Sequence, residues 1–374
     1  PGDRRGQIPS VVQGGLGAMK QALREEKWDR AVRAGGHLTG MGVCQAKLYS
    51  SLAFAYRELK DAGRSSVWAR RALAEGFAGP GTADLYFLLG WGCYESCRYV
   101  QALQAYEGCQ AYIHEHGEQA GDSPGIDAAS TTLLAHCRFL LGNPEDIASY
   151  KAAFIKAADR TTRCNMYSSR LLCLHTREAA PEKMLAEHLG YQQIFSDVTP
   201  YDHKRHQRHE RLRIGYISSD FRWHVMYFFY FQLLAGHDRD AFEVYCYCLN
   251  DKQDEFTRAV QSQADVWRDV AEKPYEEIAQ LIFQDEIDIL YDLAGHSAYS
   301  GLPVLAWKPA PVQLSGLGYM DTTGLPTVDY FLADSWCAPA AVEPCFTEKL
   351  LRLTSLFCYT GRLDVAEPKG APCR

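Results

Sequence analysis

Two apolar stretches decide the fold of this chain. Residues 212–219 read Leu-Arg-Ile-Gly-Tyr-Ile-Ser-Ser, and residues 287–296 read Ile-Asp-Ile-Leu-Tyr-Asp-Leu-Ala-Gly-His. Each has the length of a buried strand, and each leads into an aspartate and a histidine, namely Asp220 with His224 and Asp292 with His296. Open α/β sheets carry their chemistry where strands end and loops begin. The two stretches therefore predict a catalytic lobe in the C-terminal part of the chain.

The sequence around these stretches alternates between strand-like and helix-like segments. Strands are predicted at 212–218, 242–249, 266–270 and 287–293, and helices at 225–235, 254–264, 275–284 and 301–307. Two further apolar runs, at 312–317 and 328–333, are bounded by Pro and Gly. Such alternation is typical of a doubly wound, mostly parallel α/β sheet. The consecutive aromatic residues at 227–231 are expected to pack against that sheet rather than to stack on a sugar.

The N-terminal part has the pattern of tetratricopeptide-like helical repeats. Leu89-Gly90 is followed by Ala102 and Tyr106, an earlier copy contains Leu52-Ala53, and a weaker copy lies at 27–31. Small residues at these positions let one helix approach the next, and an aromatic residue packs the following repeat. An ordinary helical bundle is the alternative. In either case each helix pair has an apolar face that it buries only against its neighbours.

Between the two parts the sequence predicts a loop, further helices and a linker. The loop is placed at 114–128 and the helices at 129–141, 145–158, 165–174 and 181–195. Residues 199–211 are polar and basic and carry His203, His206 and His209 at every third position. We interpret this segment as a solvated linker between domains, and a metal-binding histidine tract is the less favoured alternative.

The composition excludes several classes of protein. The net charge of −7 and the pI of about 6.0 do not fit a nucleic-acid-binding protein, which normally shows a basic domain or stripe. No apolar stretch approaches the roughly 20 residues of a membrane span, and no signal peptide is visible at the start, which is Pro1 rather than Met. The 13 cysteines are scattered through apolar segments, which predicts reduced, buried thiols in a cytoplasmic protein.

Residues 213–359 resemble the first catalytic lobe of the O-linked N-acetylglucosamine transferases, the glycosyltransferase family 41 type that includes bacterial and SPINDLY-like relatives. The resemblance lies in an ordered series of motifs: Arg-Ile-Gly-Tyr-Ile-Ser-Ser-Asp-Phe (213–221), Phe-Glu-Val-Tyr-Cys-Tyr (242–247), Ile-Asp-Ile-Leu-Tyr-Asp-Leu-Ala-Gly-His-Ser (287–297), Lys-Pro-Ala-Pro-Val-Gln (308–313) and Asp-Tyr-Phe-Leu-Ala-Asp (329–334). It implies a glycosyltransferase B fold of two facing α/β lobes. It also implies transfer of a sugar from a UDP-sugar to Ser or Thr of a polypeptide presented by the helical repeats, without a cofactor or a metal.

The resemblance gives several residues candidate roles. It makes His224 and His296 the candidate catalytic residues, since an imidazole can accept the acceptor's proton or position the acceptor. Residues assigned to substrate and donor binding are Asp220, Asp292, Gly295, Ser297, Thr322 and Thr323. The alternatives for the two aspartates are helix caps or turns, and for the two threonines a turn before Gly-Leu-Pro (324–326). No residue is assigned to a metal.

Two departures limit the resemblance. The family's Gly-Tyr-Pro-Gly-Thr loop here has Met320 and Asp321 in place of Pro and Gly, which adds a negative charge near the expected phosphates. The second lobe is expected to be absent, so that the histidines would face water and the chain alone would be inactive. We divide the chain into repeats at 1–113, further helices at 114–198, a linker at 199–211 and the first lobe at 212–374.

A non-catalytic tetratricopeptide adaptor is the alternative function. Such a protein would bind a peptide or a partner chain. A separate chain that supplies the second lobe, or self-association, would be a further partner. A third alternative keeps the fold but changes the chemistry, with a different sugar donor or with asparagine as the acceptor.

Overall fold

The structure is a computed structural model that describes most of the chain, namely residues 10–117, 125–141, 159–175 and 180–356. The chain divides into two compact units, Pro1–Met166 and Tyr167–Arg374, and the division falls inside a helix. The helix predicted at 145–158 lies outside the described residues.

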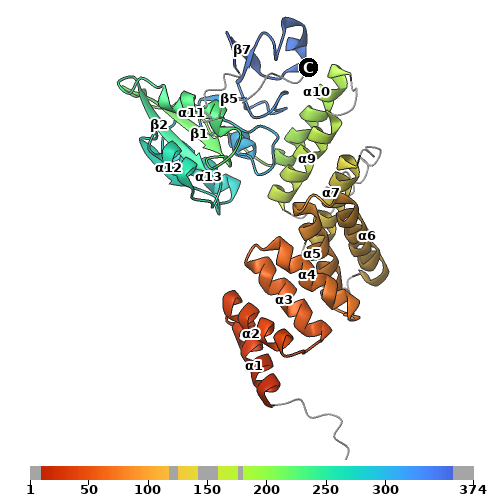
Figure 1. Ribbon diagram of the computed structural model, residues 1–374. Coiled ribbons are helices and arrows are strands. Elements are labelled where there is room, and N and C mark those ends of the chain that lie inside the picture. The colour runs from red at the N-terminus through yellow and green to blue at the C-terminus, as the bar shows by residue number, and fades with distance from the viewer. Residues whose placement is uncertain (1–9, 118–124, 142–158, 176–179, 357–374) are drawn as a thin grey trace, which may run out of the picture. The chain divides into compact units, whose positions relative to one another are not determined.

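The first unit is a stack of helices in which each helix packs against the next one in the chain (Figure 1). The helices are α1 (Ser10–Arg24), α2 (Trp28–Gly40), α3 (Ala46–Glu58), α4 (Ala62–Ala74), α5 (Thr82–Glu95), α6 (Tyr99–His116) and α7 (Ile126–Leu140). Short connections between consecutive helices favour antiparallel neighbours. The predicted helical array is confirmed, and the last part of the predicted loop at 114–128 belongs to α7.

Small residues allow the close helix contacts that the repeat pattern predicts. Tyr106 of α6 is fully buried and lies against Gly90 of α5, where an added Cβ would come within 2.5 Å of the tyrosine ring. Ala53 and Ala69 are also fully buried in the core of the stack. The Asp61 side chain accepts the Arg64 backbone N–H at 2.8 Å and thereby caps α4.

Replacing Gly90 with alanine is expected to destabilise the first unit. Alanine normally favours a helix over glycine by about 0.5–1 kcal/mol, but here the new methyl group collides with the Tyr106 ring, and overpacking typically costs about 1–3 kcal/mol. The matched control is Gly36→Ala in α2, where no atom lies within 4 Å of the new Cβ. Urea unfolding should show opposite signs for the two variants, and a stabilised Gly90→Ala protein would contradict the packing.

The second unit is an α/β sheet with helices and short 3₁₀ segments. Its strands are β1 (Leu212–Ser218), β2 (Phe242–Cys248), β3 (Val266–Asp269), β4 (Ile289–Asp292), β5 (Val312–Gly316), β6 (Tyr330–Asp334) and β7 (Lys349–Leu353). Its helical elements are the end of α9 (Arg160–Leu174), α10 (Pro181–Leu189), η3 (Gly190–Phe195), α11 (Tyr227–Ala235), α12 (Glu255–Gln261), α13 (Tyr275–Gln284), η4 (Leu302–Trp307) and η5 (Ala340–Cys345).

All seven strands are parallel and follow the order β3-β2-β1-β4-β5-β6-β7. The chain builds the sheet outward from β1 to β3 and then returns to place β4 on the other side of β1. The predicted doubly wound fold is confirmed. Strand β7 and the segment η5 were not predicted, because β7 is a short edge strand whose residues are alternately exposed and carry charges.

The inner strands are buried on both faces, as their continuous apolar sequences require. The last five residues of both β1 and β2 are buried. The aromatic helix α11 packs its Tyr230 into this core with no exposure, in agreement with the prediction that these aromatic residues are structural.

The cysteines that the structure describes are free thiols, and several are core residues. Cys246 and Cys248 of β2 are fully buried, and burial raises the pKa of the Cys248 thiol to about 11. None of the described helices combines the length and the hydropathy that a membrane crossing requires.

Candidate functional site

The return of the chain from β3 to β4 creates a switch point between β1 and β4. Ligands of open α/β sheets bind outside the carboxyl ends of the strands at such a point. Ile217 of β1 is paired with Asp292 of β4, so the loops that follow the two strands begin side by side. The structure therefore brings together the two strand ends that the sequence singled out.

Asp220 and His224 form a carboxylate–imidazole pair in the loop after β1. The Asp220 side chain is mostly buried, and one of its oxygens lies 3.5 Å from His224 Nδ1, while the other lies 3.5 Å from the Arg222 guanidinium. Burial raises the pKa of Asp220, and the positive charges of His224 and Arg222 oppose this shift. The His224 side chain keeps 34% of its surface exposed, so it remains accessible to a substrate.

The chemistry of this pair depends on which nitrogen faces the carboxylate. The Asp220 carboxylate beside Nδ1 favours the tautomer with the proton on Nδ1, which leaves the Nε2 lone pair to accept a proton. The Met226 backbone N–H, which donates to the same Nδ1 at 3.4 Å, favours the other tautomer. The Asp220 backbone is itself fixed, because its N–H donates to Ser218 Oγ at 2.9 Å and its carbonyl accepts the Tyr230 hydroxyl at 2.8 Å. The structure therefore fixes the Asp220 backbone, and it leaves the neighbouring His224 side chain accessible at the edge of the sheet.

Asp292 forms the turn after β4 and does not bond to a histidine. Its fully buried carboxylate accepts the Gly295 N–H at 2.8 Å and the Ser315 hydroxyl at 2.9 Å. Burial raises the pKa of Asp292 to about 6, although these hydrogen bonds stabilise the carboxylate and lower the pKa. Gly295 has φ of +56°, and a Cβ there would lie 2.4 Å from Tyr319 Cβ. Of the roles considered for Asp292, the structure shows the turn.

His296 is buried, and the expectation that it would face water is wrong. Only 1% of its surface is exposed. Its Nε2–H donates to the Thr323 carbonyl at 2.9 Å, and its Nδ1 is 3.0 Å from the Ser168 hydroxyl, which donates to it. Burial and the nearby His188 lower the pKa of His296 to about 3, so the ring is neutral at physiological pH. Residues of α9, α10 and η3 contact the His296 ring and keep water away from it.

Thr322 and Thr323 are fully buried and bind a glutamate that the sequence analysis missed. The Glu348 carboxylate accepts the Thr322 hydroxyl at 2.7 Å and the Thr323 N–H at 2.8 Å, and it also accepts the Thr323 hydroxyl. Glu348 is itself 4% exposed. These bonds hold the loop to the residue that directly precedes β7, and donor binding by the two threonines stays a prediction. Ser297 is half-buried, next to the covered His296.

Replacing Glu348 with alanine is expected to lower the free energy of unfolding by about 3 kcal/mol. The change leaves buried hydroxyl and N–H donors without an acceptor, and each such loss costs about 1–3 kcal/mol. Glu343→Ala is the control, because its exposed carboxylate pairs with Arg352 at the surface and such pairs contribute about 0–1 kcal/mol. Equal thermal and urea stability of the two variants would contradict this network.

Asp321, one of the two residues that depart from the family's loop, has a histidine as its neighbour. The Asp321 carboxylate lies 3.7 Å from His175 Nε2, and Met320 is exposed. The preceding Tyr319 hydroxyl lies 3.0 Å from His175 Nε2 and 2.9 Å from His188 Nε2. The added charge therefore lies near the imidazole of His175, which directly follows α9.

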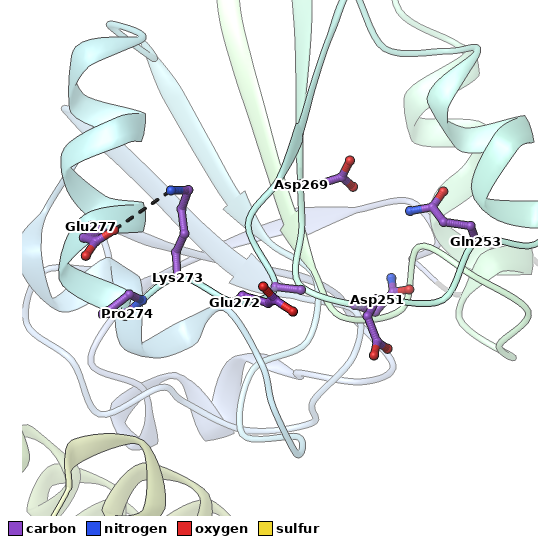
Figure 2. Close-up of a pocket in the computed structure, with 9 residues that line it drawn as sticks. Asp251, Gln253, Asp269, Glu272, Lys273, Pro274 and Glu277 are labelled. Carbon is purple, nitrogen blue, oxygen red and sulfur yellow. Dashed lines mark ion pairs between the residues drawn. The ribbon is translucent and has the colours of Figure 1, made fainter. Parts of the chain in front are cut away.

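A hollow with a volume of about 610 Å³ lies beyond β2 and β3 (Figure 2). Its charged lining is mainly acidic, and its lysine, Lys273, is 3.9 Å from Glu277. The acidic residues around it are Asp251, Asp269, Glu272 and Glu277. Since negative charges repel a diphosphate, this hollow is a poor place for a UDP-sugar, and the switch point between β1 and β4 is the better candidate site.

Comparisons with known proteins agree with this architecture. Residues 172–362, about half of the chain, match the model of a family described as Glycosyl transferase family 41. A Petunia hybrida protein called "Probable UDP-N-acetylglucosamine--peptide N-acetylglucosaminyltransferase SPINDLY" is 31% identical over 218 residues, which cover 56% of this chain and 23% of that protein. An Arabidopsis thaliana protein with the same description and the name SEC is 34% identical over 176 residues, which cover 46% of this chain and 18% of that protein.

One solved structure with a similar fold is a mutant of the Thermobaculum terrenum O-GlcNAc transferase. The TM-score is 0.53 at 24% identity, and the match covers 93% of this chain and 59% of that chain. The two curated relatives are much longer, and this chain spans less than a quarter of either of them. On the family match, the chain belongs to glycosyl transferase family 41.

Proposed function

We propose that this chain supplies the helical array and the acceptor-side lobe of a protein glycosyltransferase. The donor is a UDP-sugar, and UDP-N-acetylglucosamine is the first choice because the names of the relatives specify it. The acceptor is Ser or Thr of a polypeptide held by the helical repeats in a reducing, cytoplasmic setting. The observation that carries the proposal is the accessible His224–Asp220 pair at the switch point of a family 41 lobe.

In the proposed reaction His224 acts as the general base. Its Nε2 takes the proton of the acceptor hydroxyl as that oxygen bonds to the anomeric carbon, and the bond from this carbon to UDP breaks with its electron pair on the departing phosphate. Asp220 steadies the imidazolium that forms. The buried His296 serves this site as a structural support, since its two ring nitrogens are already bonded to Ser168 and Thr323.

The test is a transfer assay with the natural protein that carries this sequence. The protein is incubated with a peptide pool and, in separate reactions, with UDP-N-acetylglucosamine, UDP-glucose and GDP-fucose, and the peptides are analysed by mass spectrometry. A sugar adduct on Ser or Thr that requires a UDP-sugar supports the proposal. Peptides that bind to the protein but stay unmodified with every donor would instead favour the adaptor, and an adduct on Asn or from GDP-fucose would favour a changed chemistry.

A further inference from the structure

The histidine-rich segment 199–211 lies against the sheet at its amino edge. His203, His206 and His209 are partly buried, whereas the two residues after each of the first two histidines are exposed. The His206 and His209 side chains keep 16% and 13% of their surface exposed, and Asp288, which directly precedes β4, keeps 11%. Every third residue of the segment thus turns inward, and two of them converge on one carboxylate.

The contacts of this carboxylate are short and specific. His206 Nε2 lies 2.7 Å from Asp288 Oδ1, and His209 Nδ1 lies 2.9 Å from Asp288 Oδ2. The other nitrogen of His209, Nε2, lies 3.4 Å from Glu286 Oε2. The Arg213 backbone N–H donates to Asp288 Oδ2 at 2.8 Å and fixes its orientation. Over the described part of the chain, no lysine or arginine side chain forms an ion pair with Asp288.

The three imidazole–carboxylate contacts need one N–H donor more than two neutral imidazoles have, although Arg213 Nη1 also lies 3.7 Å from Glu286 Oε2. A neutral imidazole has one N–H, so His209 can donate to Asp288 or to Glu286 but not to both. Both contacts are satisfied only when His209 carries an extra proton or when a cation takes the place of one proton. The ligand atoms of His206, His209 and Asp288 all lie within 4.8 Å of one another, close enough to hold one ion.

A second histidine cluster in the same unit has enough hydrogen-bond donors for all of its contacts when its rings are neutral. His188 Nδ1–H donates to the Met184 carbonyl at 2.8 Å, which leaves its Nε2 to accept the Tyr319 hydroxyl. The Tyr319 oxygen then accepts from His175 Nε2–H. With neutral rings every one of these bonds has one donor and one acceptor, although His175, His188 and Asp321 also have ligand atoms within 4.8 Å of one another.

We propose that His206, His209 and Asp288 bind a divalent transition-metal ion of the zinc type. Two imidazoles and one carboxylate are ligands that zinc accepts, with water in the fourth position. Glu286 would hold His209 through the ring nitrogen that does not bind the metal, which is the usual arrangement around metal-bound histidines. The ion would fasten the segment 199–211 to the start of β4.

The site is separate from the proposed sugar-transfer chemistry. Asp288 directly precedes β4 and Asp292 is its last residue, and their separation of four residues corresponds to about 13 Å along a strand. The metal therefore has a structural role, and its loss should leave the His224–Asp220 pair in place.

The experiment is a Co²⁺ titration of the full chain after removal of metals with a chelator. Absorption in the visible range reports the ion, and thiolate charge-transfer bands report any ion on the cysteines. The wild type should bind one more Co²⁺ per chain than His206→Gln/His209→Gln, without a thiolate band for that ion, and Zn²⁺ should displace it. His203→Gln is the matched control from the same segment, since the His203 Nε2 is bonded to the Lys308 carbonyl, and it should bind as the wild type does.

A second variant keeps the test decisive if the double variant fails to fold. Glu286 is 41% exposed, so Glu286→Gln should fold, and loss of its contact with His209 should weaken Co²⁺ binding about 10–100-fold. Equal binding by the wild type, the double variant and Glu286→Gln would overturn the proposal and identify the cluster as a protonated ion pair. A thiolate band on every bound ion would overturn it as well.

Discussion

Replacing His296 with alanine is expected to destabilise the α/β unit by about 3 to 5 kcal/mol at pH 7.5. The change removes a fully enclosed ring and leaves two buried groups, the Ser168 hydroxyl and the Thr323 carbonyl, without their partner. A cavity and unsatisfied buried polar groups are among the few changes that produce effects of this size. Urea unfolding followed by tryptophan fluorescence measures the difference.

The cost of this substitution is expected to depend on pH. A histidine of the unfolded chain titrates near 6.5, whereas burial holds the pKa of His296 at about 3 in the folded protein. Below pH 6.5 the unfolded state therefore binds a proton that the folded state does not, and the wild type loses stability as the pH falls toward 3. The contribution is about 1.4 kcal/mol per pH unit. The difference between wild type and variant should shrink by about 2 to 3 kcal/mol between pH 7.5 and pH 4.5.

The comparison with a variant isolates this effect from that of Asp292. The pKa of Asp292 is raised to about 6, so its protonation stabilises the folded state as the pH falls, which opposes the effect of His296. Asp292 is present in both proteins, and its contribution cancels in the difference. A difference that stays constant with pH would mean that His296 is not buried as a neutral ring.

Replacing His224 with alanine is expected to lower the rate of sugar transfer about 10²- to 10⁴-fold, the range typical for a lost general base. The stability of the protein should change little, because the side chain is one-third exposed and its contact with Asp220 is a long 3.5 Å. His237→Gln is the matched control, since His237 follows the other end of α11 and bonds to the Tyr216 hydroxyl. Initial rates at saturating donor and acceptor measure the effect, and a His224→Ala enzyme as fast as the control would exclude the base.

The local sequence predicted the elements whose apolar residues follow a clear strand or helix pattern. Strand β1 and helix α13 have the predicted bounds, because a continuous apolar run or a clear helical period leaves no alternative. Strand β7 was missed, since an edge strand with alternately exposed residues resembles a loop. The strand-end residues Asp220 and Asp292 were placed correctly at one edge of the sheet, because parallel topology fixes where strand ends meet.

The surroundings of the site residues could not be predicted from local sequence. Ser168 is 128 residues away from the His296 that it covers, and nothing in the intervening sequence indicates that contact. Glu348 is likewise separated from Thr322 and Thr323, and a glutamate before an apolar run usually lies at the surface. The roles of these residues follow from tertiary contacts between segments that are far apart in the sequence.

The central claim is that substrates bind at the switch point between β1 and β4. Hydrogen–deuterium exchange of the natural protein, with and without UDP and an acceptor peptide, tests it most directly. We expect slower exchange in residues 220–226 and 297–300, which follow the two strands, and unchanged exchange around the acidic hollow at 269–277. Slower exchange confined to 269–277, or confined to the helical array, would contradict the account.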